Sequence, residues 1–285
     1  MKIKFCKFHG FGNDYTVFEA EELKNISTTR QDFAVKVCNR HTSIGGDGIA
    51  VLEKLDGSVA DYDCQIINPD GSIAGFSGNG TRCAVSYLYY KGLWQAESLK
   101  LRTLSGIKKY QLLKREADTF WFLAELGKPK FASDEIPYVA DEKLNPVINQ
   151  QLMVNNQPIT FTALNVGNPV AVIFVENFEN LDWCEIGKKL EIHPNFPEKT
   201  NVVFVKIVDD ANIEIRIWER AAGETSSSGT CSIAAAVGHL LHKNLRGNVS
   251  VHAVGGTTEA VWREEDGEMM ITGRADLAFC GEVFE

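Results

Sequence analysis

Two stretches of small residues each run directly into a long apolar segment. SGNGT at residues 77–81 precedes RCAVSYLYYKG, and SGT at residues 228–230 precedes CSIAAAVGHLLHKN. This pattern predicts a loop that opens a buried helix. The start of a helix presents backbone N–H groups and a partial positive charge, so each stretch could bind an anion such as a carboxylate. Ser77 and Ser228 are then the candidate reactive side chains.

Two such helix starts could together support proton transfer at carbon. Their N–H groups would hold a carboxylate and stabilise the negative charge that develops when a proton leaves the neighbouring carbon. One side chain could remove that proton and a second could return one to the opposite face, which is the chemistry of a cofactor-independent racemase or epimerase. The two stretches lie about half the chain apart, which favours an internal duplication. The alternative is that Ser and Gly are ordinary helix-start residues.

The elements that must position these loops are mostly strands. Alternating apolar runs predict strands at residues 3–10, 15–20, 49–53, 99–106, 108–116 and 119–126, with helices at residues 30–40 and 81–93. A second round follows, with a strand-turn-strand at residues 160–176, a short helix at 181–193, a hairpin at 200–220 and closing strands after the second helix. The polar, proline-bearing segment at residues 131–146 is the candidate linker or domain crossing.

Composition and charge exclude several classes of protein. The 285 residues are 44% hydrophobic and 24% charged, which is typical of a globular protein with a full core. A net charge of −9 without a basic stripe argues against a nucleic-acid partner. No apolar run has the length of a membrane span or a signal peptide, so we expect a cytoplasmic protein. The seven scattered cysteines form no CxxC pair, which favours buried thiols over a disulfide framework or a zinc site.

Several longer motifs, in order along nearly the whole chain, resemble the diaminopimelate epimerase family. They are HGFGND (residues 9–14), GGDG (45–48), INPDGS (67–72), SGNGTRC (77–83), VGNP (166–169), KTNVVF (199–204) and ERAAGET through SSGT (219–230). The resemblance implies an α+β fold of two pseudo-symmetric domains, each a β-barrel-like mixed sheet around a central helix. The first would comprise residues 1–120 and 272–285 and the second residues 121–271, with the substrate in a cleft between them.

The resemblance also implies roles for individual residues. The side chains expected to hold the distal amino-acid end of the substrate are Asn13, Asn68, Asn168 and Asn201, with Glu219 and Arg220 helping to order that end. The backbone amides expected to take the reacting α-carboxylate are those of Gly78, Asn79, Gly229 and Thr230. From the residues alone, each asparagine is equally consistent with a turn or helix cap.

This chain departs from the family pattern at the reacting positions. The family has cysteines where Ser77 and Ser228 stand, and a histidine where Val170 follows GNP. A thiol has a pKa near 8.5, whereas an alcohol resembles water at about 15.7, so forming the base costs roughly 10 kcal/mol more. Cys83 belongs to the usual motif and is expected to pack in its helix. Candidate replacement groups are Glu219, Glu224, Asp70 and Cys231.

The favoured function is that of a cofactor-independent amino-acid epimerase, which by the resemblance converts LL- to meso-diaminopimelate in lysine biosynthesis. Its catalytic residues would be Ser77 and Ser228. Two alternatives stay open: a dehydratase or double-bond isomerase acting on a related small acid, and a catalytically silent relative that binds an amino acid. None of these requires pyridoxal phosphate or a metal, and the expected partner is a small amino acid. We leave open a homodimer, because nothing in the sequence determines the oligomeric state.

Overall fold

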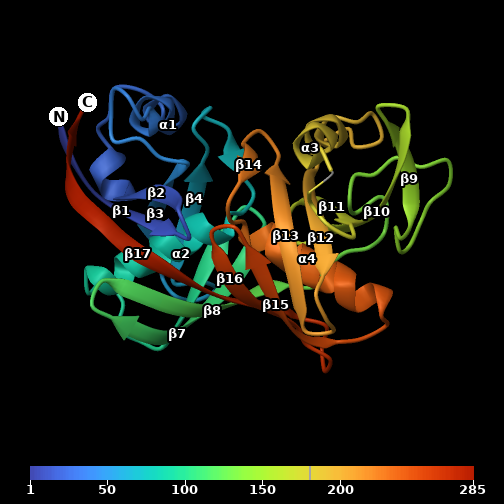
Figure 1. Cartoon of the computed structure of the whole chain (residues 1–285). Coiled ribbons are helices and arrows are strands. Elements are labelled where there is room, and N and C mark those ends of the chain that lie inside the picture. Colours follow the sequence, from blue (N-terminus) through green and yellow to red (C-terminus); the bar gives the residue numbers. More distant parts are fainter. Residues whose placement is uncertain (180) are drawn as a thin grey trace. The chain divides into compact units, whose positions relative to one another are not determined.

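The computed structural model describes residues 1–179 and 181–285, which fold into two compact units (Figure 1). Unit 1 comprises Met1–Glu125 and Thr272–Glu285, and unit 2 comprises Leu126–Ile271. Strands dominate both units, and each unit holds one long buried helix: α2 (Gly78–Tyr90) in unit 1 and α4 (Gly229–His242) in unit 2. The expected mixed α+β class is confirmed.

The strands of unit 1 form a closed barrel. They are β1 (Lys2–Gly10), β2 (Asn13–Glu19), β3 (Gly48–Lys54), β4 (Tyr62–Ile67), β6 (Ser98–Thr103), β7 (Gly106–Glu116), β8 (Thr119–Gly127) and β17 (Met269–Phe284). Each pairs with the next in this order, and β17 pairs with both β8 and β1, which closes the ring. The short β5 (Ile73–Ala74) pairs with β4 and leads to the start of α2.

Helix α2 is enclosed by this barrel. Every residue from Gly78 to Tyr89 is buried, and the helix packs against β1, β2, β3 and β4. A helix that is apolar on all sides requires such an enclosure, as its sequence predicted. A 3-10 helix, η1 (Ala20–Leu23), and helix α1 (Arg30–Cys38) contribute Leu23 and Phe33 to a separate apolar cluster with β1 to β3.

The strands of unit 2 form a second, mixed sheet. They are β9 (Gln150–Val154), β10 (Gln157–Asn165), β11 (Pro169–Phe174), β12 (Asn201–Ile207), β13 (Asn212–Glu219), β14 (Gly223–Thr225), β15 (Gly247–Ala253) and β16 (Gly256–Trp262), and residues 269–271 of β17 pair with β16. Helix α3 (Trp183–Glu191) packs on β12 and β13, and α4 packs against β10 to β13, β15 and β16.

The two units repeat one topology. In unit 1 the parallel pairs β2–β3 and β4–β6 flank the antiparallel pair β3–β4, and α2 lies in the connection between β4 and β6. In unit 2 the parallel pairs β11–β12 and β13–β15 flank the antiparallel pair β12–β13, and α4 lies in the connection between β13 and β15. Both Ser-Gly stretches therefore follow a short strand, β5 or β14, at the same point of this topology.

Two expectations from the sequence were wrong in detail. The segment at residues 131–146 is neither a linker nor the crossing between the units, because it lies within unit 2 and its Ile136 and Tyr138 are buried in the core. Cys6 and Cys280 form a disulfide, although they are 274 residues apart in the sequence. They meet because the first strand pairs with the last strand of the chain, with these two residues in register. Four of the five free cysteines are buried, as expected.

The packing of α3 on β13 gives a test of the unit 2 core. A methyl group on Gly187 would lie 2.7 Å from Cβ of Trp218, whose indole donates a hydrogen bond to Glu191. Gly187→Ala should therefore lower the free energy of unfolding by about 1 kcal/mol, because overpacking outweighs the better helix propensity of alanine. Urea denaturation measures this, with the exposed neighbour Lys188→Ala as the control. A more stable Gly187→Ala protein would contradict the packing.

Candidate active site

Ser77 is the N-cap of α2. Its Oγ accepts the Gly80 N–H at 3.1 Å, and its carbonyl accepts the Thr81 N–H at 2.9 Å. A serine cap of this kind satisfies one of the four N-terminal donors of a helix. Because the cap bonds begin at the third residue, Gly78 and Asn79 supply the first two N–H groups of the helix, as the sequence predicted.

Ser228 is the N-cap of α4 in the same way. Its Oγ accepts the Cys231 N–H at 3.4 Å, and its carbonyl accepts the Ser232 N–H at 2.9 Å. Gly229 and Thr230 therefore supply the first two N–H groups of this helix. Ser228 is buried, and the positive end of the helix dipole lies at its side chain.

Glu219 is the carboxylate that contacts Ser228. The Ser228 hydroxyl donates a hydrogen bond of 2.8 Å to Oε2, and Thr225 donates one of 2.8 Å to Oε1. Strand β14 makes this possible, because it folds back antiparallel on the end of β13 with Gly223 opposite Glu219. The competing carboxylate Glu224 is exposed and lies 3.8 Å from the Cys184 thiol instead.

Asn68 and Asp70 are tied into a local turn. Asn68 donates from its backbone and its side chain to Ser72, at 2.8 and 2.9 Å. Oδ1 of Asp70 accepts from the Ser72 backbone N–H and hydroxyl at 2.9 and 2.6 Å. Asp70 thus stabilises the turn that presents Asn68.

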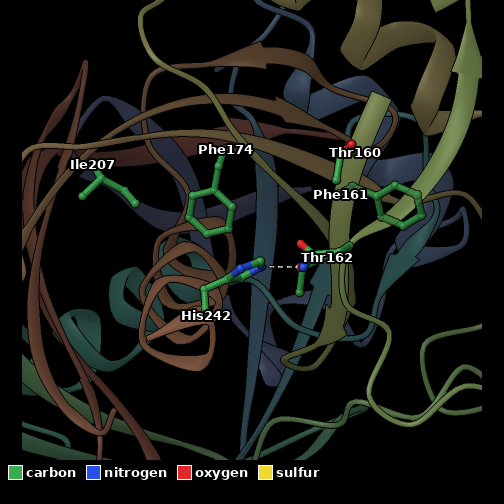
Figure 2. A pocket seen from close by; sticks show the side chains of 7 residues that line it. Thr160, Phe161, Thr162, Phe174, Ile207 and His242 are labelled. Carbon is green, nitrogen blue, oxygen red and sulfur yellow. Dashed lines mark hydrogen bonds between the residues drawn. The ribbon is translucent and has the colours of Figure 1, made fainter. Parts of the chain in front are cut away.

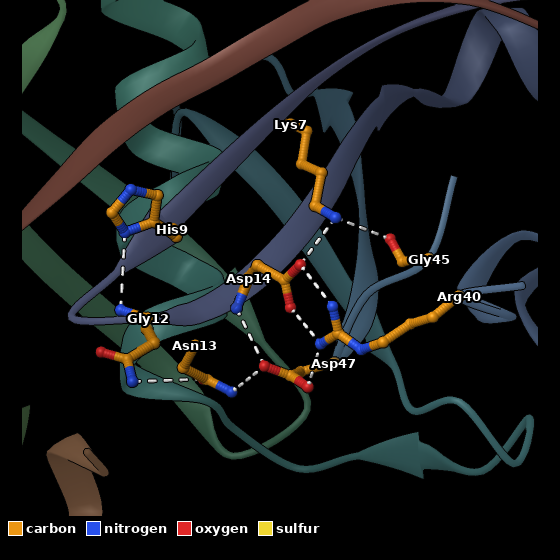
Figure 3. Close-up of polar contacts among 9 residues, drawn as sticks. Lys7, His9, Gly12, Asn13, Asp14, Arg40, Gly45 and Asp47 are labelled. Carbon is orange, nitrogen blue, oxygen red and sulfur yellow. Dashed lines mark hydrogen bonds and ion pairs between the residues drawn. The ribbon is translucent and has the colours of Figure 1, made fainter. Parts of the chain in front are cut away.

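Asn13 and Asn79 form a direct pair beside the start of α2. Asn13 opens β2 after a two-residue turn, in which Phe11 and Gly12 both have positive φ, a geometry typical of tight hairpins. Asn79 Nδ2 donates to Asn13 Oδ1 at 3.2 Å, and Asn13 Nδ2 donates to Asp47 Oδ2 at 2.8 Å (Figure 3). Asp47 therefore fixes the orientation of the Asn13 amide.

A network of ion pairs lies next to Asn13 (Figure 3). Asp14 binds Lys7 Nζ at 2.6 Å and Arg40 Nη2 at 2.6 Å, and Arg40 also binds Asp47 at 2.7 Å. Burial opposes ionisation of Asp14, but the hydrogen bonds from Arg40 and Lys7 outweigh it and hold its pKa well below the usual range. Burial and the neighbouring Asp14 raise the pKa of Asp47.

The predicted residues of unit 2 also gather around the start of α4 and the end of β13. Asn168 Nδ2 donates to Thr230 Oγ1 at 3.3 Å, and its buried Oδ1 has no hydrogen-bond partner among the described residues. Asn201 Oδ1 accepts the backbone N–H of Arg220 at 2.8 Å. The exposed Arg220 side chain donates to the Glu198 carbonyl. Asn201 thus helps to hold the turn that follows Glu219.

The nearby cysteines are poor candidates for a reactive thiol. Cys231 is fully buried, and burial together with the charge of Glu219 raises the pKa of its thiol well above the usual value. Cys83 is also fully buried, and burial raises its pKa to about 12. A reactive thiolate needs access and a lowered pKa, so both cysteines are packing residues.

A pocket lies at the other end of α4, away from Ser228. A cavity of about 290 Å³ is bounded by Phe161, Phe174, Ile207 and His242 among others (Figure 2). His242, the last residue of α4, bonds Thr162 at 2.8 Å, and burial lowers its pKa. Because Ser228 caps the opposite end of the helix, this cavity is separate from the candidate site.

Two kinds of feature are not found in residues 1–179 and 181–285, the part of the chain that the structure describes. In this part of the chain, no three His, Cys, Asp or Glu side chains are arranged to hold a metal ion. None of its helices has both the length and the hydropathy to span a membrane.

Comparison with known proteins identifies the family of this chain. The family model "Diaminopimelate epimerase" matches residues 5–132 and 162–278. The chain therefore belongs to the diaminopimelate epimerase family. It is 36% identical over 283 residues to the diaminopimelate epimerase of Heliobacterium modesticaldum, and 32% identical over 283 residues to that of Methanococcus maripaludis, covering 99% of both chains in each case.

The fold is shared more widely. A hydroxyproline epimerase from Agrobacterium vitis, solved with bound trans-4-hydroxy-L-proline, superposes with a TM-score of 0.71 at 16% identity, covering 99% of this chain and 91% of that one. At that identity the likeness concerns the fold alone.

Three residues around the site were not singled out from the sequence. Tyr15 lies against Ser77, with 3.0 Å between the two hydroxyl oxygens, and Asp47 and Arg40 support Asn13. Tyr15 and Asp47 lie beside or within the family motifs GFGND and GGDG. Pairing of β2 with β3 brings these motifs together, a contact that spacing in the sequence does not reveal.

The charge network predicts a stability effect with a defined pH dependence. Asp14→Asn leaves the buried Lys7 without its carboxylate and should cost about 3 kcal/mol of unfolding free energy at pH 7. The folded-state pKa of Asp14 is lowered, so its contribution is complete above the unfolded pKa near 3.9 and is lost as the pH falls through the lower folded value.

Urea denaturation of wild type and variant between pH 7 and pH 2 measures this difference. The control is Asp63→Asn, which removes the exposed ion pair with Arg102 and should cost no more than about 1 kcal/mol. Equal losses for the two variants at pH 7, or a loss at Asp14 that grows in acid, would contradict the interpretation.

Proposed function

We propose that this protein is a cofactor-independent amino-acid epimerase that moves a proton at Cα, with diaminopimelate as substrate. The observation that carries the proposal is the hydrogen bond from Ser228 to Glu219 at the start of α4. This bond places a proton acceptor within hydrogen-bond distance of one of the two hydroxyls that stand in place of the family's thiols. Membership of the family and relatives named diaminopimelate epimerase support the reaction class and the substrate.

In this proposal the first amides of α2 and α4 bind the α-carboxylate of one substrate molecule. They are the N–H groups of Gly78, Asn79, Gly229 and Thr230. Partial positive charge at each helix start also favours the enolate-like charge that develops when Cα loses its proton. The distal amino-acid end is assigned to Asn13, Asn68, Asn168, Asn201 and Arg220, following the family motifs.

Two roles were expected for Glu219: ordering the distal end of the substrate, or replacing a missing base. Its carboxylate oxygens accept hydrogen bonds from the Ser228 and Thr225 hydroxyls, which supports the second role. We assign it as the proton acceptor behind Ser228. The proton passes from Cα to the Ser228 oxygen while the Ser228 proton passes to Glu219. A free alkoxide, which would cost roughly 10 kcal/mol more than a thiolate, therefore never accumulates.

Deuterium wash-in tests the proposed reaction. Wild-type protein incubated with LL- or meso-diaminopimelate in D₂O should incorporate deuterium at Cα and interconvert the isomers, as measured by mass spectrometry after chiral separation. A product whose mass differs from that of diaminopimelate by more than the deuterium uptake would indicate elimination instead of epimerisation. Binding measured by calorimetry without deuterium incorporation or a new product would show a silent amino-acid-binding protein and contradict the proposal.

Restoring the thiols gives a second prediction. The double variant Ser77→Cys and Ser228→Cys should raise the wash-in rate at pH 8 by at least about 10²-fold, because a thiol with a pKa near 8.5 is partly ionised there. Ser58→Cys, on an exposed loop, should leave the rate unchanged. If the double variant binds diaminopimelate normally but exchanges no faster than wild type, these two positions do not carry the proton transfer.

A further inference from the structure

The hydroxyl of Tyr15 lies at the second reacting serine. The Ser77 hydroxyl donates a hydrogen bond of 3.0 Å to the Tyr15 hydroxyl oxygen. Tyr15 lies in β2 and is 5% exposed, whereas Ser77 is partly exposed at the start of α2. The Tyr15 phenol thus accepts the hydrogen bond of the Ser77 hydroxyl, as Glu219 accepts that of the Ser228 hydroxyl.

The ring of Tyr15 is held in place by two glycines. A Cβ on Gly48 would lie 2.6 Å from Cε1 of the ring, and a Cβ on Gly80 would lie 2.9 Å from the same atom. Both distances are too short for a real side chain, so any larger residue at either position would displace the ring. Gly48 ends the GGDG motif and Gly80 lies in SGNGT. Two motifs therefore leave room for one aromatic ring beside Ser77.

The two hydroxyl pairs differ in chemistry. Glu219 accepts hydrogen bonds on both carboxylate oxygens, so the Ser228 pair is set to receive a proton. A phenol has an ordinary pKa of about 10, some six pKa units below that of an alcohol, so it gives up a proton far more readily than serine alone. The Ser77 pair can deliver one once the Ser77 hydroxyl turns from the Tyr15 oxygen toward Cα and the phenol donates to the Ser77 oxygen in its place. Val170 stands where the family resemblance places a histidine, and it is fully buried in β11.

We propose that Tyr15 is the proton-relay partner of Ser77, so that the protein works with a carboxylate relay on one face of the substrate and a phenol relay on the other. This inference rests on the proposed function. In the forward step Glu219 gains the Cα proton through Ser228. On the opposite face Ser77 gives its proton to Cα and takes the proton of Tyr15. Tyr15 is left as phenolate and Glu219 as carboxylic acid, and exchange with solvent restores both.

Exchange of single isomers separates this role from a structural one. In Tyr15→Phe the Ser228 face is intact, so the isomer whose Cα–H points to Ser228 still takes up deuterium without inverting. The opposite isomer, whose Cα–H points to Ser77, should lose wash-in by at least about 10²-fold. Glu219→Gln should abolish deuterium wash-in for the isomer whose Cα–H points to Ser228. The probes are LL- and meso-diaminopimelate in D₂O, with initial rates and configuration measured for each.

A matched control removes a different buried phenol at α2. Tyr110 donates to Thr81 Oγ1 at 2.5 Å and does not contact Ser77 in the described residues. Tyr110→Phe should leave both wash-in rates within about threefold of wild type, and all variants should bind diaminopimelate with unchanged affinity. The double variant Tyr15→Phe with Ser77→Ala should be no slower than Ser77→Ala alone, because the two residues act as one unit.

The outcomes distinguish the two proposals. If wild type exchanges both isomers and Tyr15→Phe does the same, or slows both equally, the relay is wrong while the epimerase function stands. If wild type exchanges neither isomer, the proposed function fails and the relay fails with it. Loss confined to one isomer in Tyr15→Phe, and to the other in Glu219→Gln, supports the relay.

Discussion

The structure depends on one constraint, which is the need to enclose two long apolar helices in strands while capping their first turns. Strands pack around α2 and α4, and the chain enters each helix through a short strand and a serine cap. The cap uses the third N–H group of the helix and leaves the first two ahead of it. The same topology thus stabilises the core and presents the helix starts that we propose as the carboxylate-binding site.

A serine at the positions where the family resemblance places cysteines changes what the surrounding residues would have to do. A thiol can ionise by itself near neutral pH, whereas an alcohol needs a partner that takes or gives the proton. Ser228 has Glu219 as a neighbour, and Ser77 has Tyr15. These partners differ in acidity although the units that hold them share one topology. The proposed proton-transfer partners of the two serines are therefore chemically different, although the two units share one topology.

Much of the site was predictable because short motifs encode local structure. The caps at Ser77 and Ser228 follow from Ser-Gly before an apolar run, and the burial of α2 follows from its composition. Long-range contacts were not predictable. Tyr15 meets Ser77 across 62 residues, and Cys6 meets Cys280 only through pairing of the terminal strands. The segment at residues 131–146 was misread because its polar surface residues concealed the buried Ile136.

The central proposal is that the helix starts bind the carboxylate of the substrate, and a crystal structure of the complex with meso-diaminopimelate tests it most directly. We expect carboxylate oxygens at about 2.7–3.2 Å from the N–H groups of Gly78 or Asn79 and of Gly229 or Thr230. A ligand whose carboxylate lies away from these amides, or contacts the helix start of one unit alone, would contradict the account.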